Sequence, residues 1–199
     1  GDEFPQSLVD GMANLGLFGV VVPAEYGGSP VSLSTYASIM EELSAGWTSL
    51  PSFLNSHCSV ASIISQFGTD EQRELYLPRL ADGSMRGAVM LSEPGAGSDI
   101  RSMKTRAVRD GDDYVINGNK HFISHADVAD FVILFAATGT EDTAHGAKKL
   151  ITGFLVDLDA PGVTVRRGSS AVSHRGYHQC ELSFVDCRVP ATVRLGEEG

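Results

Sequence analysis

Met90-Leu91-Ser92-Glu93-Pro94-Gly95-Ala96-Gly97-Ser98-Asp99 is the most informative stretch of this sequence. It overlaps the end of a predicted strand at residues 86–91, and its proline and two glycines predict a loop whose backbone amides can approach a phosphate or the edge of a ring. The hydrophobic pattern differs on its two sides. Upstream of Gly83 apolar residues recur at helical spacing, and downstream they alternate as in strands. We therefore expect a helical domain at residues 1–83 and a β domain, which contains the loop, at residues 84–199.

The helical domain is predicted from three apolar stripes and one capping motif. The stripes consist of Leu8, Met12 and Leu15, of Tyr36, Ile39, Met40 and Leu43, and of Val60, Ile63, Ile64 and Phe67. Thr69 followed by Gln72 forms a capping box that opens a fourth helix, and Gly68 suits the C′ position that ends the third. Pro78 lies inside the fourth helix and should kink it or mark its last turn.

The β domain is predicted from runs rich in β-branched residues with alternating polarity. These runs cover residues 86–91, 105–109, 114–117, 120–124, 131–138, 150–157, 163–167 and 180–185. Residues 110–112 and 117–119 carry hairpin-turn chemistry, and the polar run 138–149 is the best loop candidate. Because strands follow strands with no helix between them, we expect an antiparallel barrel or sandwich. The fold class is α+β, with an all-helical domain first.

The composition sets limits on partners and compartment. Lys and Arg number 15 against 25 Asp and Glu, and the net charge of -10 creates a field that repels phosphate backbones and anionic lipids. No apolar run approaches the roughly 20 residues that cross a bilayer, and the start lacks a signal-peptide pattern. Cys58, Cys180 and Cys187 are odd in number and irregularly spaced, which argues against a disulfide framework. We expect no nucleic-acid or membrane partner, and a cytoplasmic location, or the mitochondrial matrix in a eukaryote.

The glycine loop matches none of the common nucleotide-binding motifs. Ile100 occupies the position of the third glycine in a dinucleotide-binding fingerprint, and no Gly-Lys-Ser/Thr follows as a Walker loop requires. On the residues alone, a tight surface turn remains the alternative interpretation. No serine lies in a Gly-x-Ser-x-Gly elbow, so nucleophilic hydrolase chemistry has no support.

A second candidate segment is Asn119-Lys120-His121-Phe122-Ile123-Ser124. An aromatic ring and a hydroxyl two residues apart on a strand share one face, where the ring could cover a planar cofactor and the hydroxyl could bind its polar edge. The alternative is an ordinary half-buried strand. His121 with His125, and His174 with His178, have the i, i+4 spacing of metal ligands, but both segments are predicted as strand or loop, so we expect no metal site.

Several motifs follow one another in a fixed order along the chain. They are the stretch at 91–99, Lys104-Thr105, the hairpin at 111–118, Lys120-His121-Phe122-Ile123-Ser124, the Cys-Glu-Leu-Ser-Phe run at 180–184 and Asp186-Cys187-Arg188-Val189-Pro190. Upstream motifs lie at 22–28, 41–44 and 67–72. Together they resemble the acyl-CoA dehydrogenase family over essentially the whole chain.

The resemblance implies an N-terminal helical domain, a middle β domain and a C-terminal four-helix domain, with FAD held between the last two and across a subunit interface of a homo-oligomer. It places Leu91 and Ser92 near the flavin ring and Ser98 near both FAD and acyl-CoA. Phe122 stands where the family usually has Trp and would cover the ring, with Ser124 donating toward flavin N5. The full set of implied FAD contacts is Val89, Leu91, Ser92, Gly97, Ser98, Phe122, Ile123 and Ser124.

The implied reaction is the oxidation of an acyl-CoA to the 2,3-enoyl-CoA, with electrons passed to an electron-transfer flavoprotein. In the family the catalytic carboxylate base comes from the C-terminal domain, so no residue here is assigned as the base, and Glu93 belongs to the loop motif. The chain is accordingly expected to be a fragment of a dimeric or tetrameric enzyme, inactive by itself. Alternatives are a flavin oxidase or monooxygenase of the same fold and a non-catalytic CoA-binding scaffold.

Overall fold

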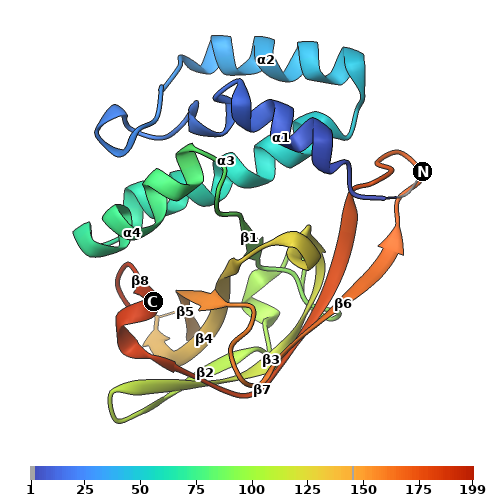
Figure 1. The fold of residues 1–199 in the computed structure, drawn as a ribbon. Coiled ribbons are helices and arrows are strands. Elements are labelled where there is room, and N and C mark those ends of the chain that lie inside the picture. The colour runs from blue at the N-terminus through green and yellow to red at the C-terminus, as the bar shows by residue number, and fades with distance from the viewer. Residues whose placement is uncertain (1–2, 145) are drawn as a thin grey trace.

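Four α-helices form a layer on one side of a curled sheet in a computed structural model that describes residues 3–144 and 146–199 (Figure 1). The helices are α1 (Gln6–Asn14), α2 (Leu33–Gly46), α3 (Leu50–Phe67) and α4 (Asp70–Ala81). Short 3-10 turns lie between α1 and α2. The second and third predicted apolar stripes fall within α2 and α3, and the first falls in α1 except for Leu15, which lies just past its end and is exposed. The helical half of the fold class is confirmed.

The start of α4 has the predicted capping box and a further role. Thr69 Oγ1 accepts from the backbone N of Gln72, and Gln72 Oε1 accepts from the backbone N of Thr69. Gln72 Nε2 also donates to the backbone oxygens of Thr192 and Arg194, both at 3.0 Å. The same side chain therefore caps the helix and fixes the last part of the chain against it. Pro78 lies inside α4, as predicted.

The sheet has eight strands: β1 (Gly87–Met90), β2 (Arg106–Asp110), β3 (Asp113–Ser124), β4 (Phe131–Thr143), β5 (Gly146–Asp157), β6 (Val163–Ser170), β7 (His178–Pro190) and β8 (Arg194–Leu195). Its order is β6-β7-β3-β2-β4-β5-β8, and β1 also pairs with β4. Figure 1 shows the sheet curled into a half-barrel beneath the helices.

The expectation of purely antiparallel pairing needs correction. Both β1 and β2 lie parallel to β4. Parallel neighbours require a long connection, and here the chain passes through the glycine loop, β2 and β3 between β1 and β4, and through β3 between β2 and β4. The remaining pairings, including β2 with β3 and β3 with β7, are antiparallel.

One predicted turn is confirmed and another is wrong. Asp110 pairs with Asp113 across a tight turn in which Gly111 has a φ of 63°. At residues 117–119, by contrast, β3 continues with a bulge after Ile116. Gly118 is needed there for space, because a Cβ on it would lie 2.3 Å from Thr105 Oγ1.

The predicted loop at 138–149 is also wrong. β4 extends to Thr143 and β5 begins at Gly146, and the ladder sets Glu141 opposite Lys148. Cross-strand pairs of opposite charge stabilise such polar strands, and the absence of apolar alternation concealed them from sequence analysis. Gly68 differs in a smaller way: it ends α3 with a φ of -68°, not in the left-handed conformation of a C′ glycine.

Three clusters of buried side chains hold the fold together. One fills the curl of the sheet and includes Met90, Ile123, Leu134, Phe154 and Leu182. The second joins α3 and α4 to β4 and β5, through residues such as Ile64, Leu77, Ile133 and Leu155. The third lies among the helices around Val9, Met12, Phe18 and Leu54. The three cysteines are free and buried within these clusters, as expected for packing residues.

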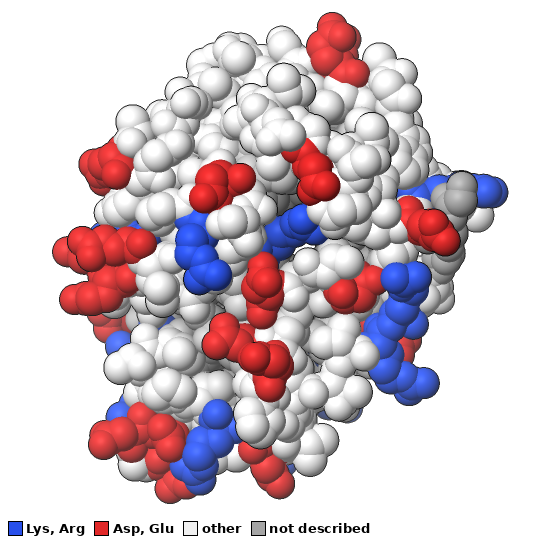
Figure 2. Space-filling view, in the orientation of Figure 1, with Lys and Arg blue, Asp and Glu red and all other residues white. Residues whose placement is uncertain are grey.

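Charged side chains are unevenly distributed on the face drawn in Figure 2. Acidic and basic groups are interspersed over the middle and lower parts, whereas the helical layer at the top carries few. Exposed leucines in or next to the first two helices, Leu8, Leu15 and Leu33, add apolar area. Within the described ranges, no helix is long and apolar enough to cross a membrane.

Candidate functional site

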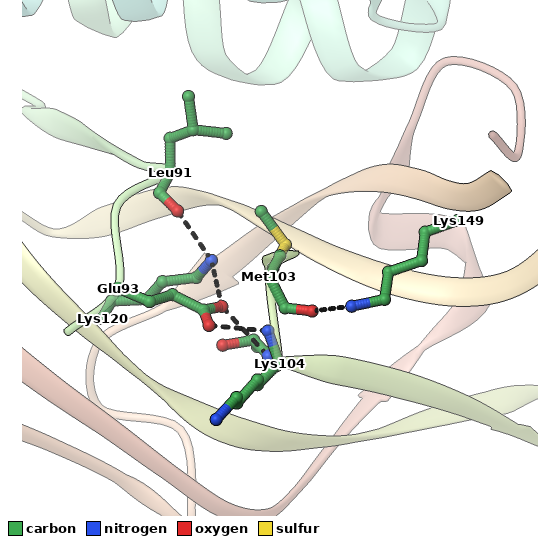
Figure 3. Close-up of polar contacts among 7 residues, drawn as sticks. Leu91, Glu93, Met103, Lys104, Lys120 and Lys149 are labelled. Atoms are coloured by element: carbon green, nitrogen blue, oxygen red, sulfur yellow. Dashed lines mark hydrogen bonds and ion pairs between the residues drawn. The ribbon is translucent and has the colours of Figure 1, made fainter. Parts of the chain in front are cut away.

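A buried ion pair holds the glycine loop against β3 (Figure 3). Lys120 Nζ lies 3.1 Å from Glu93 Oε1 and donates to the backbone oxygen of Leu91 at 3.0 Å, and the two side chains are 0% and 5% exposed. Glu93 also accepts from the backbone N of Lys104 at 2.7 Å and of Thr105 at 3.0 Å. One carboxylate therefore connects the loop, β3 and the segment that leads into β2.

Hydrogen bonding keeps Glu93 ionised in this setting. Burial alone would raise its pKa, but donors from Thr105, Lys104 and Lys120 outweigh burial and hold the pKa below its usual value. Burial lowers the pKa of Lys120, and the neighbouring carboxylate opposes that change. With its oxygens committed to buried donors, Glu93 has a structural role, in agreement with its assignment to the loop motif.

The far end of the loop is also fixed by short-range contacts. Asp99 Oδ1 accepts from the backbone N of Arg101 at 3.2 Å, and Asp99 Oδ2 accepts from Ser102 Oγ. Lys149 Nζ of β5 donates to the backbone oxygen of Met103 at 2.5 Å (Figure 3). The loop is thus held at both ends, and Gly95 and Gly97 are exposed between them while Ala96 is buried.

The structure brings the two predicted segments side by side. His121 N donates to the backbone oxygen of Ser92 at 3.0 Å, which joins residues 91–92 to residues 121–124. A bulge between Lys120 and Ile123 places Phe122 at a φ of 58°, and its side chain is 62% exposed. Ser124 is half-buried. An aromatic ring and two serines from distant parts of the sequence therefore occupy one region.

The remaining predicted residues occupy different environments. Val89 is half-buried in β1 and pairs with Ile133 of β4. Gly97 and Ser98 are exposed on the loop. The side chain of Ile123 lies in the sheet core with 2% exposure, so only its backbone can face a ligand. Of the predicted set, Ser92, Phe122 and Ser124 are the residues with side chains best placed to contact a bound group.

These three residues fit a planar ligand with polar edges. A positive φ is costly for a bulky residue and is concentrated at functional sites, so Phe122 is held outward at an energetic cost. Within the described ranges the hydroxyls of Ser92 and Ser124 have no hydrogen-bond partner in the protein and can donate to a ligand. An exposed ring with free donors on a rigid frame suits a flavin.

A shallow groove of about 410 Å³ adjoins this region. Its lining includes Pro94 of the loop, His121, Arg166 and Glu181, and His121 Nδ1 lies 3.4 Å from Glu181 Oε1. The groove was not predicted, because its walls come from β3, β6 and β7, which meet only in the folded sheet. The groove therefore has a basic side chain, Arg166, and an acidic one, Glu181, beside the loop.

A second polar cluster, also missed by sequence analysis, fixes the chain just after Ser124. Asp127 Oδ2 lies 2.6 Å from His178 Nδ1 and accepts from Arg167 Nη2 at 3.0 Å. Burial would raise the pKa of Asp127, but His178 and Arg167 outweigh it and hold the pKa low. Within the described residues no group of three or more possible metal ligands gathers, and this part of the structure shows His178 paired with Asp127.

Comparison with known proteins assigns both halves of the chain. Residues 1–84 match the model "Acyl-CoA dehydrogenase, N-terminal domain", and residues 88–187 match "Acyl-CoA dehydrogenase, middle domain". The mitochondrial isovaleryl-CoA dehydrogenase of Pongo abelii is 38% identical over 189 residues, which are 94% of this chain and 44% of that protein.

Solved structures share the fold over the whole chain. Butyryl-CoA dehydrogenase from Megasphaera elsdenii superposes with a TM-score of 0.88 at 33% identity, covering 100% of this chain and 52% of that one. The prolyl acyl carrier protein oxidase AnaB gives a TM-score of 0.87 at 34% identity, again over 100% of this chain and 52% of that one. The chain spans about half the length of the relatives it matches.

Proposed function

Because this chain belongs to the acyl-CoA dehydrogenase family, we propose that it forms the flavin-facing part of an enzyme that oxidises an acyl-CoA thioester to the 2,3-enoyl-CoA. The observation that carries the proposal is that the loop at Ser92 is hydrogen-bonded to β3 at His121, beside the exposed Phe122, on a frame fixed by the Glu93 and Lys120 ion pair. FAD, when bound, supplies the acceptor for the hydride that leaves the β-carbon of the substrate.

The residues of this chain bind the flavin and orient it relative to the substrate. Phe122 covers the flavin ring, and the hydroxyls of Ser92 and Ser124 donate to its polar edge. Leu91 packs beside the ring, and the exposed Ser98 contacts both the cofactor and the acyl-CoA. Val89, Gly97 and the backbone of Ile123 complete the cofactor surface. We assign the removal of the α-proton to no residue within 1–199.

The proposal extends to partners. The reduced enzyme passes its electrons to an electron-transfer flavoprotein, and the whole protein is a homo-oligomer, a dimer or a tetramer, in the cytoplasm or the mitochondrial matrix. The sequence similarity to acyl-CoA dehydrogenases supports these assignments.

The similarity to the oxidase AnaB supports a second candidate function, that of an oxidase whose reduced flavin reacts with oxygen. Stopped-flow reoxidation in air separates them, since slow reoxidation with product bound favours the dehydrogenase.

Ser124→Ala tests the proposed flavin contact. In the full-length protein we expect FAD affinity or the rate of flavin reduction by acyl-CoA to fall by about 2- to 13-fold, the equivalent of one lost hydrogen bond worth ~0.5 to 1.5 kcal/mol. Isothermal titration with FAD and anaerobic stopped-flow absorbance give the two quantities. Ser38→Ala, on the exposed face of α2, is the matched control and should change neither. Wild-type affinity together with a wild-type reduction rate in Ser124→Ala would contradict the assignment.

A further inference from the structure

The residue that follows Ser124 is enclosed by aromatic rings from other parts of the fold. The imidazole of His125 stacks on Phe53 of α3 with ring centroids 4.2 Å apart and an interplanar angle of 26°. Tyr177, just before β7, meets it edge-on at 4.0 Å, and Phe4 near the start of the chain does so at 5.8 Å. His125 thus connects the end of β3 to the helical layer.

The backbone conformation of His125 links the position of its ring to the position of Ser124. His125 has left-handed dihedral angles, φ 55° and ψ 23°, and its N donates to the backbone oxygen of His178 at 3.0 Å. Ser124 itself pairs with Gln179 in the β3 and β7 ladder. A left-handed residue permits little backbone adjustment, so the position of the ring and that of the preceding residue change together.

Stability alone does not account for an imidazole at this position. His125 is 8% exposed, and within the described ranges neither of its ring nitrogens has a hydrogen-bond partner. It shares a cavity of about 30 Å³ with His57, whose Nδ1 also lacks a partner there. A buried ring nitrogen that no protein group satisfies costs free energy, so packing by itself gives no reason for an imidazole rather than an apolar ring at this position.

We propose that His125 is a positioning residue, whose stacking on Phe53 sets the orientation of Ser124 toward the flavin and so couples the helical layer to the reaction. This inference rests on the proposed function, because it takes Ser124 to face the cofactor. It assigns His125 no contact with substrate or flavin, and it predicts that the ring of residue 125 influences the reaction through Phe53.

The test compares His125→Asn, Phe53→Leu and the double variant in the full-length holoenzyme. Asn keeps the preference for left-handed angles and removes the ring, so it isolates the stacking. We expect each single variant to lower the limiting rate of flavin reduction by roughly 2- to 13-fold, at most the effect of losing the Ser124 hydroxyl itself, with little change in the half-saturating acyl-CoA concentration. Because both residues act through one contact, the double variant should lose no more than the worse single variant.

Met12→Ala is the matched control, since it removes a buried side chain from the same helical core without touching residue 125. It should lower stability and leave the reduction rate unchanged. A wild-type rate in His125→Asn, an equal loss in Met12→Ala, or additive losses in the double variant would each overturn the inference.

A second readout does not depend on turnover. In the FAD-free full-length protein, amide hydrogen exchange across residues 122–126 should rise in His125→Asn and Phe53→Leu and stay unchanged in Met12→Ala. If acyl-CoA fails to reduce the wild-type flavin, the proposed function is wrong. The role of His125 is then still supported if the two variants shift the flavin reduction potential and raise this hydrogen exchange. It is overturned if the variants do neither. A protein that binds no FAD would overturn both.

Discussion

Lys120→Met should lower the free energy of unfolding by about 3 to 5 kcal/mol, because removal of one partner leaves the Glu93 carboxylate buried without its counter-charge. The side chain of Lys120 is fully buried, and that of Glu93 is 5% exposed. Loss of the ammonium also removes the hydrogen bond to the backbone oxygen of Leu91. The loop should therefore detach from β3, and FAD binding should weaken with it. Urea denaturation and FAD titration measure the two effects.

Two further variants show whether the loss of stability in Lys120→Met comes from the unpaired Glu93 charge. Lys104 is exposed, and only its backbone N contacts Glu93, so Lys104→Met should stay within about 0.5 kcal/mol of wild type. Glu93→Gln combined with Lys120→Met removes both charges and should recover part of the lost stability. A stable Lys120→Met protein with wild-type FAD affinity would show that the ion pair does not organise the site.

Acidification from pH 7 to pH 5 should cost the folded chain about 4 kcal/mol, nearly 2 kcal/mol for each of two buried histidines. Burial lowers the pKa of His57 to about 4, partly offset by its hydrogen bond to the backbone oxygen of Leu80 and reinforced by Arg86. Burial also lowers the pKa of His125 to about 3; Asp127 opposes this change, while His178 and Arg86 reinforce it.

The sign follows from proton counts. In the unfolded chain these histidines bind protons below pH ~6.5, whereas in the folded chain they stay neutral to about pH 4 and pH 3, so stability is complete above ~6.5 and falls as the pH drops. Glu93 and Asp127, whose pKa values are held low, add losses only at more acidic pH. Urea denaturation at pH 7, 6 and 5 is the measurement. His57→Gln should remove about half of the slope, and a parent stability that is constant over this range would contradict the prediction.

Local sequence patterns predicted much of this fold because the relevant forces are local. The apolar stripes and the box formed by Thr69 and Gln72 specify their helices through contacts three and four residues apart. Alternating β-branched runs likewise predicted the apolar strands. The parallel pairing of β1 with β4 escaped prediction, because it depends on how a connection crosses the sheet.

Gly118 illustrates why a local motif can mislead. Asn-Gly-Asn is typical of a hairpin turn, yet the glycine is present because Thr105 of another segment approaches its Cα. The charged ends of β4 and β5 pose the opposite problem, since their strands pair, with Glu141 opposite Lys148, although their residues show no apolar alternation. In both places a neighbour distant in sequence decides the structure.

For the candidate site, the motifs identified the loop and the strand but not what holds them together. Burial of Lys120 beside Glu93 could have been inferred only by placing the two motifs in contact. The cluster of Asp127, Arg167 and His178 had no sequence signal, because its members come from three separate elements. The aromatic rings around His125 likewise come from distant parts of the chain, namely Phe4, Phe53 and Tyr177.

The visible absorbance of the full-length protein, recorded anaerobically before and after addition of acyl-CoA, tests directly whether the site binds a flavin that acyl-CoA reduces. In the wild type we expect a bound flavin whose absorbance acyl-CoA bleaches. Phe122→Ala should bind FAD more weakly, by roughly 2- to 13-fold for the loss of a stacking contact, while keeping near-normal stability because its ring is 62% exposed. A wild-type protein that holds no flavin, or holds one that acyl-CoA leaves oxidised, would show that this is not the flavin site of an acyl-CoA dehydrogenase.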